Sequence, residues 1–210
     1  MSEPEFFAAA PSISVYDPLA EMLGAASDGT LTYHYADAVR LAGHSCPTVA
    51  GAYLTGRAAL QALYPDAVPQ RGSIAVHMPA PEEEGVSGVI AQVLTLLTGA
   101  AAAGGFKGLG GRFARNGLLT YAEHASDDDA IRFERLDNGA VVAVRFNART
   151  VAGDPAIPEL ISVVVSGRAT HEQQRVFAGA WQERVRRILL EHADDPEVVQ
   201  VTSFAATSPA

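Results

Sequence analysis

The amino-acid sequence predicts an α+β fold in which buried central helices pack against an antiparallel sheet. Two stretches, 47–64 and 86–98, repeat apolar residues at the spacing of a buried helix. Segments 73–78, 131–136 and 141–147 instead alternate apolar and polar residues, as half-buried strands do. With 210 residues, of which 48% are hydrophobic, the chain can bury one sizeable core.

The composition of the chain excludes some classes of binding partner and indicates a cellular compartment. Acidic residues outnumber Lys and Arg by 24 to 15, and the net charge of −9 argues against a phosphate backbone or an anionic membrane surface as partner. The single cysteine excludes an intrachain disulfide framework, and we identify neither a secretory leader nor an apolar run of about 20 residues. We therefore expect a cytoplasmic protein that binds neither nucleic acid nor membranes.

The chain is expected to form one domain with short extensions. Residues 1–12 carry acids, alanines and a proline without clear periodicity, so we expect a loosely ordered arm. Residues 13–204 form the α+β domain, and 205–210 a tail. Within the domain, Asp17 followed by proline starts a short helix, and Gly43 is placed to end the next one as its C-cap.

Stretch 43–49, GHSCPTV, places the single thiol beside an imidazole at the start of the first buried helix. Proline suits the first helical position, so Pro47 opens the helix and Cys46 becomes its N-cap. The helix dipole there favours thiolate, which is both a metal ligand and a nucleophile. His44 and Cys46 could thus bind a metal ion, or His44 could serve as base to a catalytic Cys46. The alternative without function is a buried cysteine that packs as a small hydrophobe.

Two further features flank the second buried helix. His77 faces the side of strand 73–78 that is opposite to its aliphatic residues. Three glutamates, 82–84, precede helix 86–98, where carboxylates complement the helix dipole. Capping is the main interpretation of these charges, and Glu84 is the candidate if one of them has a chemical role.

A glycine-rich segment, 104–116, reads GGFKGLGGRFARN and contains three cations. Glycines let backbone N–H groups approach an oxyanion, while Lys107, Arg112 and Arg115 can donate charge-assisted hydrogen bonds. The spacing fits neither a Walker loop nor a dinucleotide fingerprint. We expect a pocket for a small anionic molecule, the alternative being a surface loop with solvated cations.

The remaining third of the chain is expected to cover this core. Asp137-Asn138-Gly139 between two apolar segments is a hairpin signal. Segment 158–166 is ambiguous between helix and strand. Thr170 and Gln173 have the spacing of a capping box and start a long helix, and 199–204 suggests a last strand.

Three motifs together resemble the formylmethanofuran dehydrogenase E-subunit family: GHSCP at 43–47, LTG at 97–99, and the Lys107-Gly108 pair. The resemblance covers residues 30–125. It implies an α+β fold, a homodimer, and a metal or active site at His44 and Cys46 with Lys107 lining the same cavity.

The chain also departs from the family pattern. Ala42 stands where the family commonly has a second histidine, residues 84–87 lack a further cysteine, and the C-terminal zinc module of many members is absent. A bound zinc or other divalent transition metal would therefore need further ligands. We take His77 as the third ligand, with His34, His124, Glu84 or water as alternatives.

These observations lead to three hypotheses. The first is a small metal-binding protein, a stand-alone member of the family, with metal at His44 and Cys46 and an anionic ligand at the glycine-rich cations. The second is a metal-free enzyme or redox protein that uses Cys46 and His44. The third is a non-catalytic accessory or assembly protein, so the sequence leaves enzymatic activity open.

Overall fold

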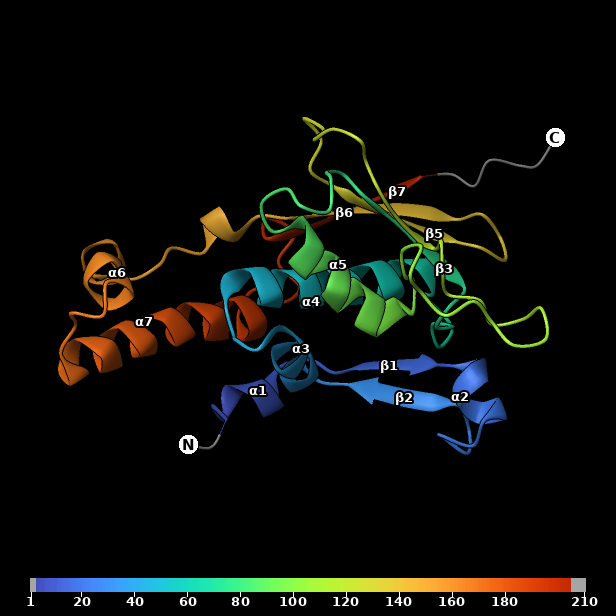
Figure 1. Cartoon of the computed structure of the whole chain (residues 1–210), viewed down its shortest axis with the longest axis horizontal. Coiled ribbons are helices and arrows are strands. Elements are labelled where there is room, and N and C mark those ends of the chain that lie inside the picture. Colours follow the sequence, from blue (N-terminus) through green and yellow to red (C-terminus); the bar gives the residue numbers. More distant parts are fainter. Residues whose placement is uncertain (1–2, 205–210) are drawn as a thin grey trace.

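The computed structural model describes residues 3–204 and has the α+β fold that the sequence predicts (Figure 1). In chain order its elements are α1 (Phe6–Ala9), β1 (Ile13–Tyr16), α2 (Pro18–Met22), β2 (Thr30–Tyr33), α3 (Tyr35–Ala42), α4 (Pro47–Leu63), β3 (Ile74–Met78), α5 (Ser87–Thr98), β4 (Leu119–Tyr121), β5 (Ile131–Arg135), β6 (Val141–Phe146), the 3₁₀ turn η1 (Ala148–Thr150), α6 (Ile157–Val165), α7 (His171–Leu190) and β7 (Val199–Phe204).

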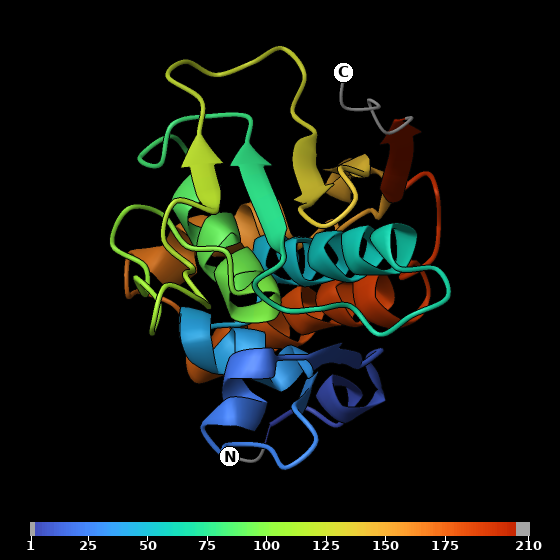
Figure 2. The same ribbon diagram turned by 90° about the vertical axis from the view of Figure 1, so that its right-hand side faces the viewer.

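The main sheet has five strands in the order β4-β3-β5-β6-β7, and β1 and β2 form a separate antiparallel pair. Strands β3, β5 and β6 are antiparallel neighbours, as expected, but β4 runs parallel to β3, so the sheet is mixed rather than purely antiparallel. The reason is that α5 connects β3 to β4 as a crossover, which brings β4 alongside β3 in the same direction. Figure 2 shows the sheet above the long helices and the N-terminal elements below them.

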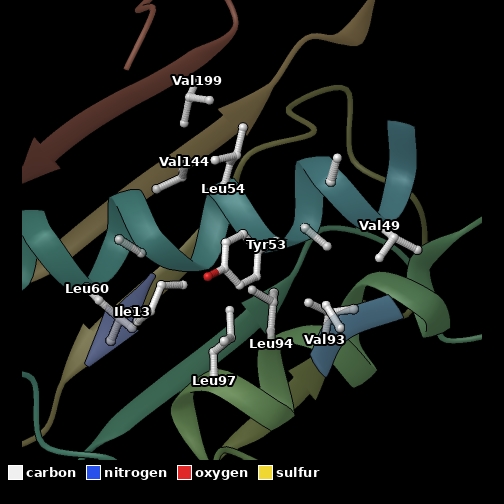
Figure 3. Close-up of a cluster of buried hydrophobic side chains, with 14 of the residues drawn as sticks. Ile13, Val49, Tyr53, Leu54, Leu60, Val93, Leu94, Leu97, Val144 and Val199 are labelled. Carbon is white, nitrogen blue, oxygen red and sulfur yellow. The ribbon is translucent and has the colours of Figure 1, made fainter. Parts of the chain in front are cut away.

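Helix α4 is the centre of the core. Eleven of its 17 residues are buried, because its sequence is apolar on nearly every face. In Figure 3, Leu54 points from α4 toward Val144 and Val199 of the sheet, whereas Tyr53 points toward α5 and its Leu94. The prediction of buried central helices at 47–64 and 86–98 is therefore confirmed, with helix ends within one residue of those expected.

Glycines on α4 let its neighbours approach closely. A Cβ atom built on Gly51 would lie 2.2 Å from the Phe146 ring, and one on Gly56 would lie 2.6 Å from Leu97. Real side chains do not meet at such distances, so these positions admit a β6 side chain and an α5 side chain against the helix backbone.

The expectation of a loosely ordered arm over 1–12 is wrong for the part that the structure describes. Residues Phe6–Ala9 form α1, and Phe7 is only 4% exposed. Its ring packs edge-to-face on Tyr35, with centroids 5.1 Å apart. Burial of this apolar ring orders the segment, although its sequence shows no periodicity. The predicted tail 205–210 lies outside the described residues.

The predicted helix caps are present in the structure. Gly43 adopts the left-handed conformation (φ 76°) as C-cap of α3, and Thr170 and Gln173 form a capping box at α7. The ambiguous segment 158–166 is helical in α6, which packs beside α7 at the end of the molecule away from β1 and β2 (Figure 1). No helix between residues 3 and 204 combines the length and apolarity needed to cross a bilayer.

Candidate functional site

The start of α4 has the capping arrangement predicted from stretch 43–49. Pro47 is the first helical residue, and Cys46 is the N-cap, whose Sγ accepts the Val49 N–H at 3.5 Å. Cys46 is only 9% exposed. The thiol is therefore already engaged in satisfying a free N–H group of the helix.

His44 and Cys46 do not form a couple in this geometry. The His44 ring is exposed, and its Nδ1 lies 3.0 Å from the carbonyl oxygen of Ala42. Within residues 3–204, no hydrogen bond joins this ring to the Cys46 sulfur. The arrangement does not support His44 as a base for Cys46, and their catalytic role stays a prediction.

His77, the predicted third metal ligand, lies on the other face of the sheet. Residues 74, 76 and 78 of β3 point toward the helices and are buried, so the alternation of the strand turns His77 outward. There its Nδ1 lies 2.9 Å from the Thr120 hydroxyl, and its Nε2 lies 3.8 Å from Glu134.

The structure therefore does not bring the three predicted metal ligands, His44, Cys46 and His77, together, and metal binding stays a prediction from the sequence. In the described part of the chain, no group of three or more His, Cys, Asp or Glu residues is arranged to hold a metal ion. Zinc usually takes three or four protein ligands, and His44 with Cys46 offers two at most. These two residues alone do not complete a zinc or other transition-metal site.

Ser45, between these two residues, makes more contacts than either. Its hydroxyl lies 2.9 Å from the Tyr35 hydroxyl and donates to Gln182 at 2.9 Å, while its carbonyl accepts from Trp181 and Gln182 at 3.1 Å. Burial raises the pKa of Tyr35 above its usual range, so this hydroxyl stays protonated. Ser45 thus joins α3 and α7 to the start of α4. No local pattern of residues marks it in advance, because its partners on α7 are distant in the chain.

A cavity of about 360 Å³ lies immediately beyond this junction, between the first turns of α4 and α5 and the sheet. We call it the α4–α5 cavity. It begins at Pro47, but neither His44 nor Cys46 lines it. Its walls are mostly apolar, and its polar lining comprises Thr48, Thr55, Glu84, Ser87 and Asp129.

Negative charge predominates at this cavity. Glu84 is exposed and makes no ion pair among the described residues. Asp129 pairs with Arg145, which also pairs with Asp128 at 2.5 Å. The lining therefore contains two carboxylates and no cationic side chain, and Arg145 outside it is shared by Asp128 and Asp129, so the local charge favours a cation over an anion.

A second cavity, of about 490 Å³, adjoins the glycine-rich segment. We call it the arginine cavity. Arg112 and Arg115 line it, as predicted, but the third cation is Arg71, and Lys107 lies exposed elsewhere on the loop. The predicted group Lys107, Arg112 and Arg115 is corrected accordingly. The other lining residues are Tyr16, Pro18, Gln70, Gly72, Ser73, Phe113 and Ala114.

Two of these arginines share a buried carboxylate. Asp17 is 3% exposed and accepts from Arg71 and Arg115, at 2.8 Å in each case. Burial alone would raise the pKa of Asp17, but the hydrogen bond from Arg71 and the charge of Arg115 outweigh it, so the pKa is lowered. Burial in turn lowers the pKa of Arg115, against the opposing effect of Asp17.

Comparison with known proteins adds no identification. No protein-family model matches the chain. No curated protein is significantly similar to it. The resemblance to the formylmethanofuran dehydrogenase E-subunit family therefore stays a prediction, as does the homodimer that it implies.

Proposed function

We propose that the chain is a small-molecule-binding protein whose ligand occupies the α4–α5 cavity and joins an apolar body to a cationic group. The observation that carries the proposal is the cavity itself: about 360 Å³ with mostly apolar walls, and with Glu84 and Asp129 in its lining. Pockets for small molecules are typically concave and largely apolar, with a few polar groups that orient the ligand.

The polar side chains that line the α4–α5 cavity are not equally free to contact a ligand. The hydroxyl of Ser87 donates to the carbonyl of Ala80 at 3.4 Å, and Asp129 is held by Arg145. Glu84 has no such partner in the described chain and is therefore the carboxylate best placed to meet an amine. Because Glu84 is exposed, water screens its charge, and its contribution to affinity should be modest.

This proposal concerns the neighbourhood of the predicted His44–Cys46 site rather than the two residues themselves. Metal binding and cysteine chemistry at that junction stay predictions from the sequence. Elemental analysis of the untagged protein tests the prediction of metal binding. Zinc in stoichiometric amount would support it, and it would also mean that the metal has ligands that the described geometry does not bring together.

The ligand class can be tested with two molecules that differ only in charge. Tryptamine and indole-3-propionate share an indole ring and a two-carbon linker, but one ends in an ammonium and the other in a carboxylate. We expect tryptamine to bind more tightly, by about threefold or more, in isothermal titration at constant ionic strength. Thr48→Trp should abolish binding of both, since it fills the cavity wall on α4.

The matched variants are Glu84→Gln and Glu83→Gln. Both remove one exposed glutamate charge from the same turn, but only Glu84 lines the cavity. Glu84→Gln should reduce tryptamine affinity by about two- to fivefold and leave that of the acid unchanged or higher, whereas Glu83→Gln should change neither. Preference for the acid, or equal effects of the two variants, would contradict the proposal.

A further inference from the structure

The arginine cavity has a floor with an excess of buried positive charge. Asp17, Arg71 and Arg115 are three charges with a net value of +1, and Arg115 is only 6% exposed. Burying a charge is costly unless it is compensated. The carboxylate of Glu21 accepts the hydroxyl of Tyr16, a lining residue, at 2.5 Å, but Glu21 is exposed and does not itself line the cavity.

The guanidinium of Arg115 is also incompletely hydrogen-bonded. Its Nη2 donates to Asp17, but its Nε is enclosed without a partner, and no described residue accepts from its Nη1. Arg71, by contrast, donates from its Nε and both Nη atoms, to Asp17 and to the Thr95 and Leu96 carbonyls that end α5. The enclosed Nε is out of reach of a ligand, so Nη1 is the Arg115 donor that remains for an acceptor in the cavity.

Further donors surround this floor. Arg112 is exposed, makes no ion pair within residues 3–204, and lies with its guanidinium carbon 4.6 Å from the centre of the Phe113 ring. The Ser73 hydroxyl accepts from Gln70 at 2.7 Å, which leaves its own proton free to donate. With Arg112 the charge of the cavity rises from +1 to +2.

We propose that the arginine cavity binds the phosphate group of a small phosphate monoester. Such a group carries about −1.5 to −2 charges near pH 7 and three acceptor oxygens, which matches two excess positive charges and several free donors. Guanidinium groups suit this geometry because they donate in pairs. At about 490 Å³ the cavity also has room for a small organic body beside the phosphate.

This site is independent of the one proposed above. The two cavities share no lining residue, and they favour ligands of opposite charge. Binding at one can therefore fail without affecting the evidence for the other.

Glycerol 3-phosphate is the probe for this site, titrated calorimetrically at constant ionic strength with acetate and glycerol for comparison. We expect the phosphate monoester to bind at least tenfold more tightly than acetate, and glycerol not to bind. Arg112→Gln should weaken phosphate binding by about tenfold to a hundredfold, the loss expected for one hydrogen bond to a charged group. Arg112 is exposed, so this variant should fold normally.

Lys107→Gln is the matched control, because Lys107 is an exposed cation of the same loop that does not line the cavity. It should change phosphate affinity by less than about twofold. Ser73→Ala is a second test within the lining, and it should weaken binding without altering the charge. Equal weakening by Lys107→Gln and Arg112→Gln would indicate diffuse attraction, and undetectable phosphate binding to the wild-type protein would show that the cavity is structural; either result overturns the proposal.

Discussion

The start of α4 and the floor of the arginine cavity both bury polar groups, but they hold them by different means. Ser45 links α3, α4 and α7 through hydrogen bonds between uncharged groups. Asp17 links α2, the segment before β3 and the glycine-rich loop through two ion pairs. An uncharged hydrogen bond contributes modestly to stability, whereas breaking a buried ion pair leaves a charge without compensation. The two regions should therefore respond very differently to substitution.

The largest effect is expected from Asp17→Asn. Asparagine preserves the size of the side chain and can still cap α2, but it leaves Arg71 and Arg115 without their shared carboxylate. We expect a loss of about 3–5 kcal/mol in the free energy of unfolding, measured by urea denaturation. Asp28→Asn is the matched control, since Asp28 also accepts a backbone N–H but forms no described ion pair; it should leave the unfolding midpoint nearly unchanged.

The same ion pairs set the pH dependence of this effect. The pKa of Asp17 is lower in the folded than in the unfolded protein, where it is about 3.9. Its contribution is therefore complete above the unfolded pKa and is lost as the pH falls through the folded pKa. The difference in stability between wild type and Asp17→Asn should shrink in that acidic range. A difference that stays constant down to pH 2 would show that the substitution acts by packing instead.

An intermediate effect is expected from Ser45→Ala. The change removes the hydroxyl that contacts Tyr35 and donates to Gln182, but leaves the Ser45 carbonyl in place for Trp181. We expect a loss of about 1–3 kcal/mol in urea denaturation. The double variant Ser45→Ala with Tyr35→Phe removes the partner hydroxyl as well, so its loss should be smaller than the sum of the two single losses. Additive losses would mean that the two hydroxyls are not coupled.

The smallest effect is expected from Cys46→Ser. Serine is an effective N-cap, so it can accept the Val49 N–H in place of sulfur. The free energy of unfolding should change by less than about 1 kcal/mol, whereas Cys46→Ala, which cannot cap, should lose about 0.5–2 kcal/mol. If Ser and Ala were equally destabilising, the sulfur would act through packing rather than through capping.

The contrast between the two regions also separates what the sequence predicts from what it does not. Capping at Cys46 and Pro47 follows from adjacent residues, because a helix start is determined within one turn. The two buried helices and the strand hairpin follow from periodicity for the same reason. The parallel strand β4 depends on how a crossover returns to the sheet, and only three residues mark it.

The candidate sites were harder to predict. Asp17, Arg71 and Arg115 are separated by 54 and 44 positions in the chain and meet only after folding, so no local pattern connects them. His77 shows the opposite problem: the alternation of β3 correctly turns it from the aliphatic side, and that same alternation separates it from Cys46. The glycines and cations of segment 104–116 correctly indicated a loop that borders a cavity, but the third arginine of that cavity is Arg71, and Lys107 does not line it.

The contacts of Ser45 with α7 have a consequence for synthesis of the chain. Ser45 and Gln182 are 137 residues apart, and α4 has much of its buried surface against elements that follow it. At about 5–20 residues per second, a ribosome needs roughly 7–27 s to add α7 after Ser45 has been incorporated. During that interval the helix with the most buried residues in the described chain lacks its final cover, so we expect its apolar side chains to be exposed on the nascent chain until α7 has been made.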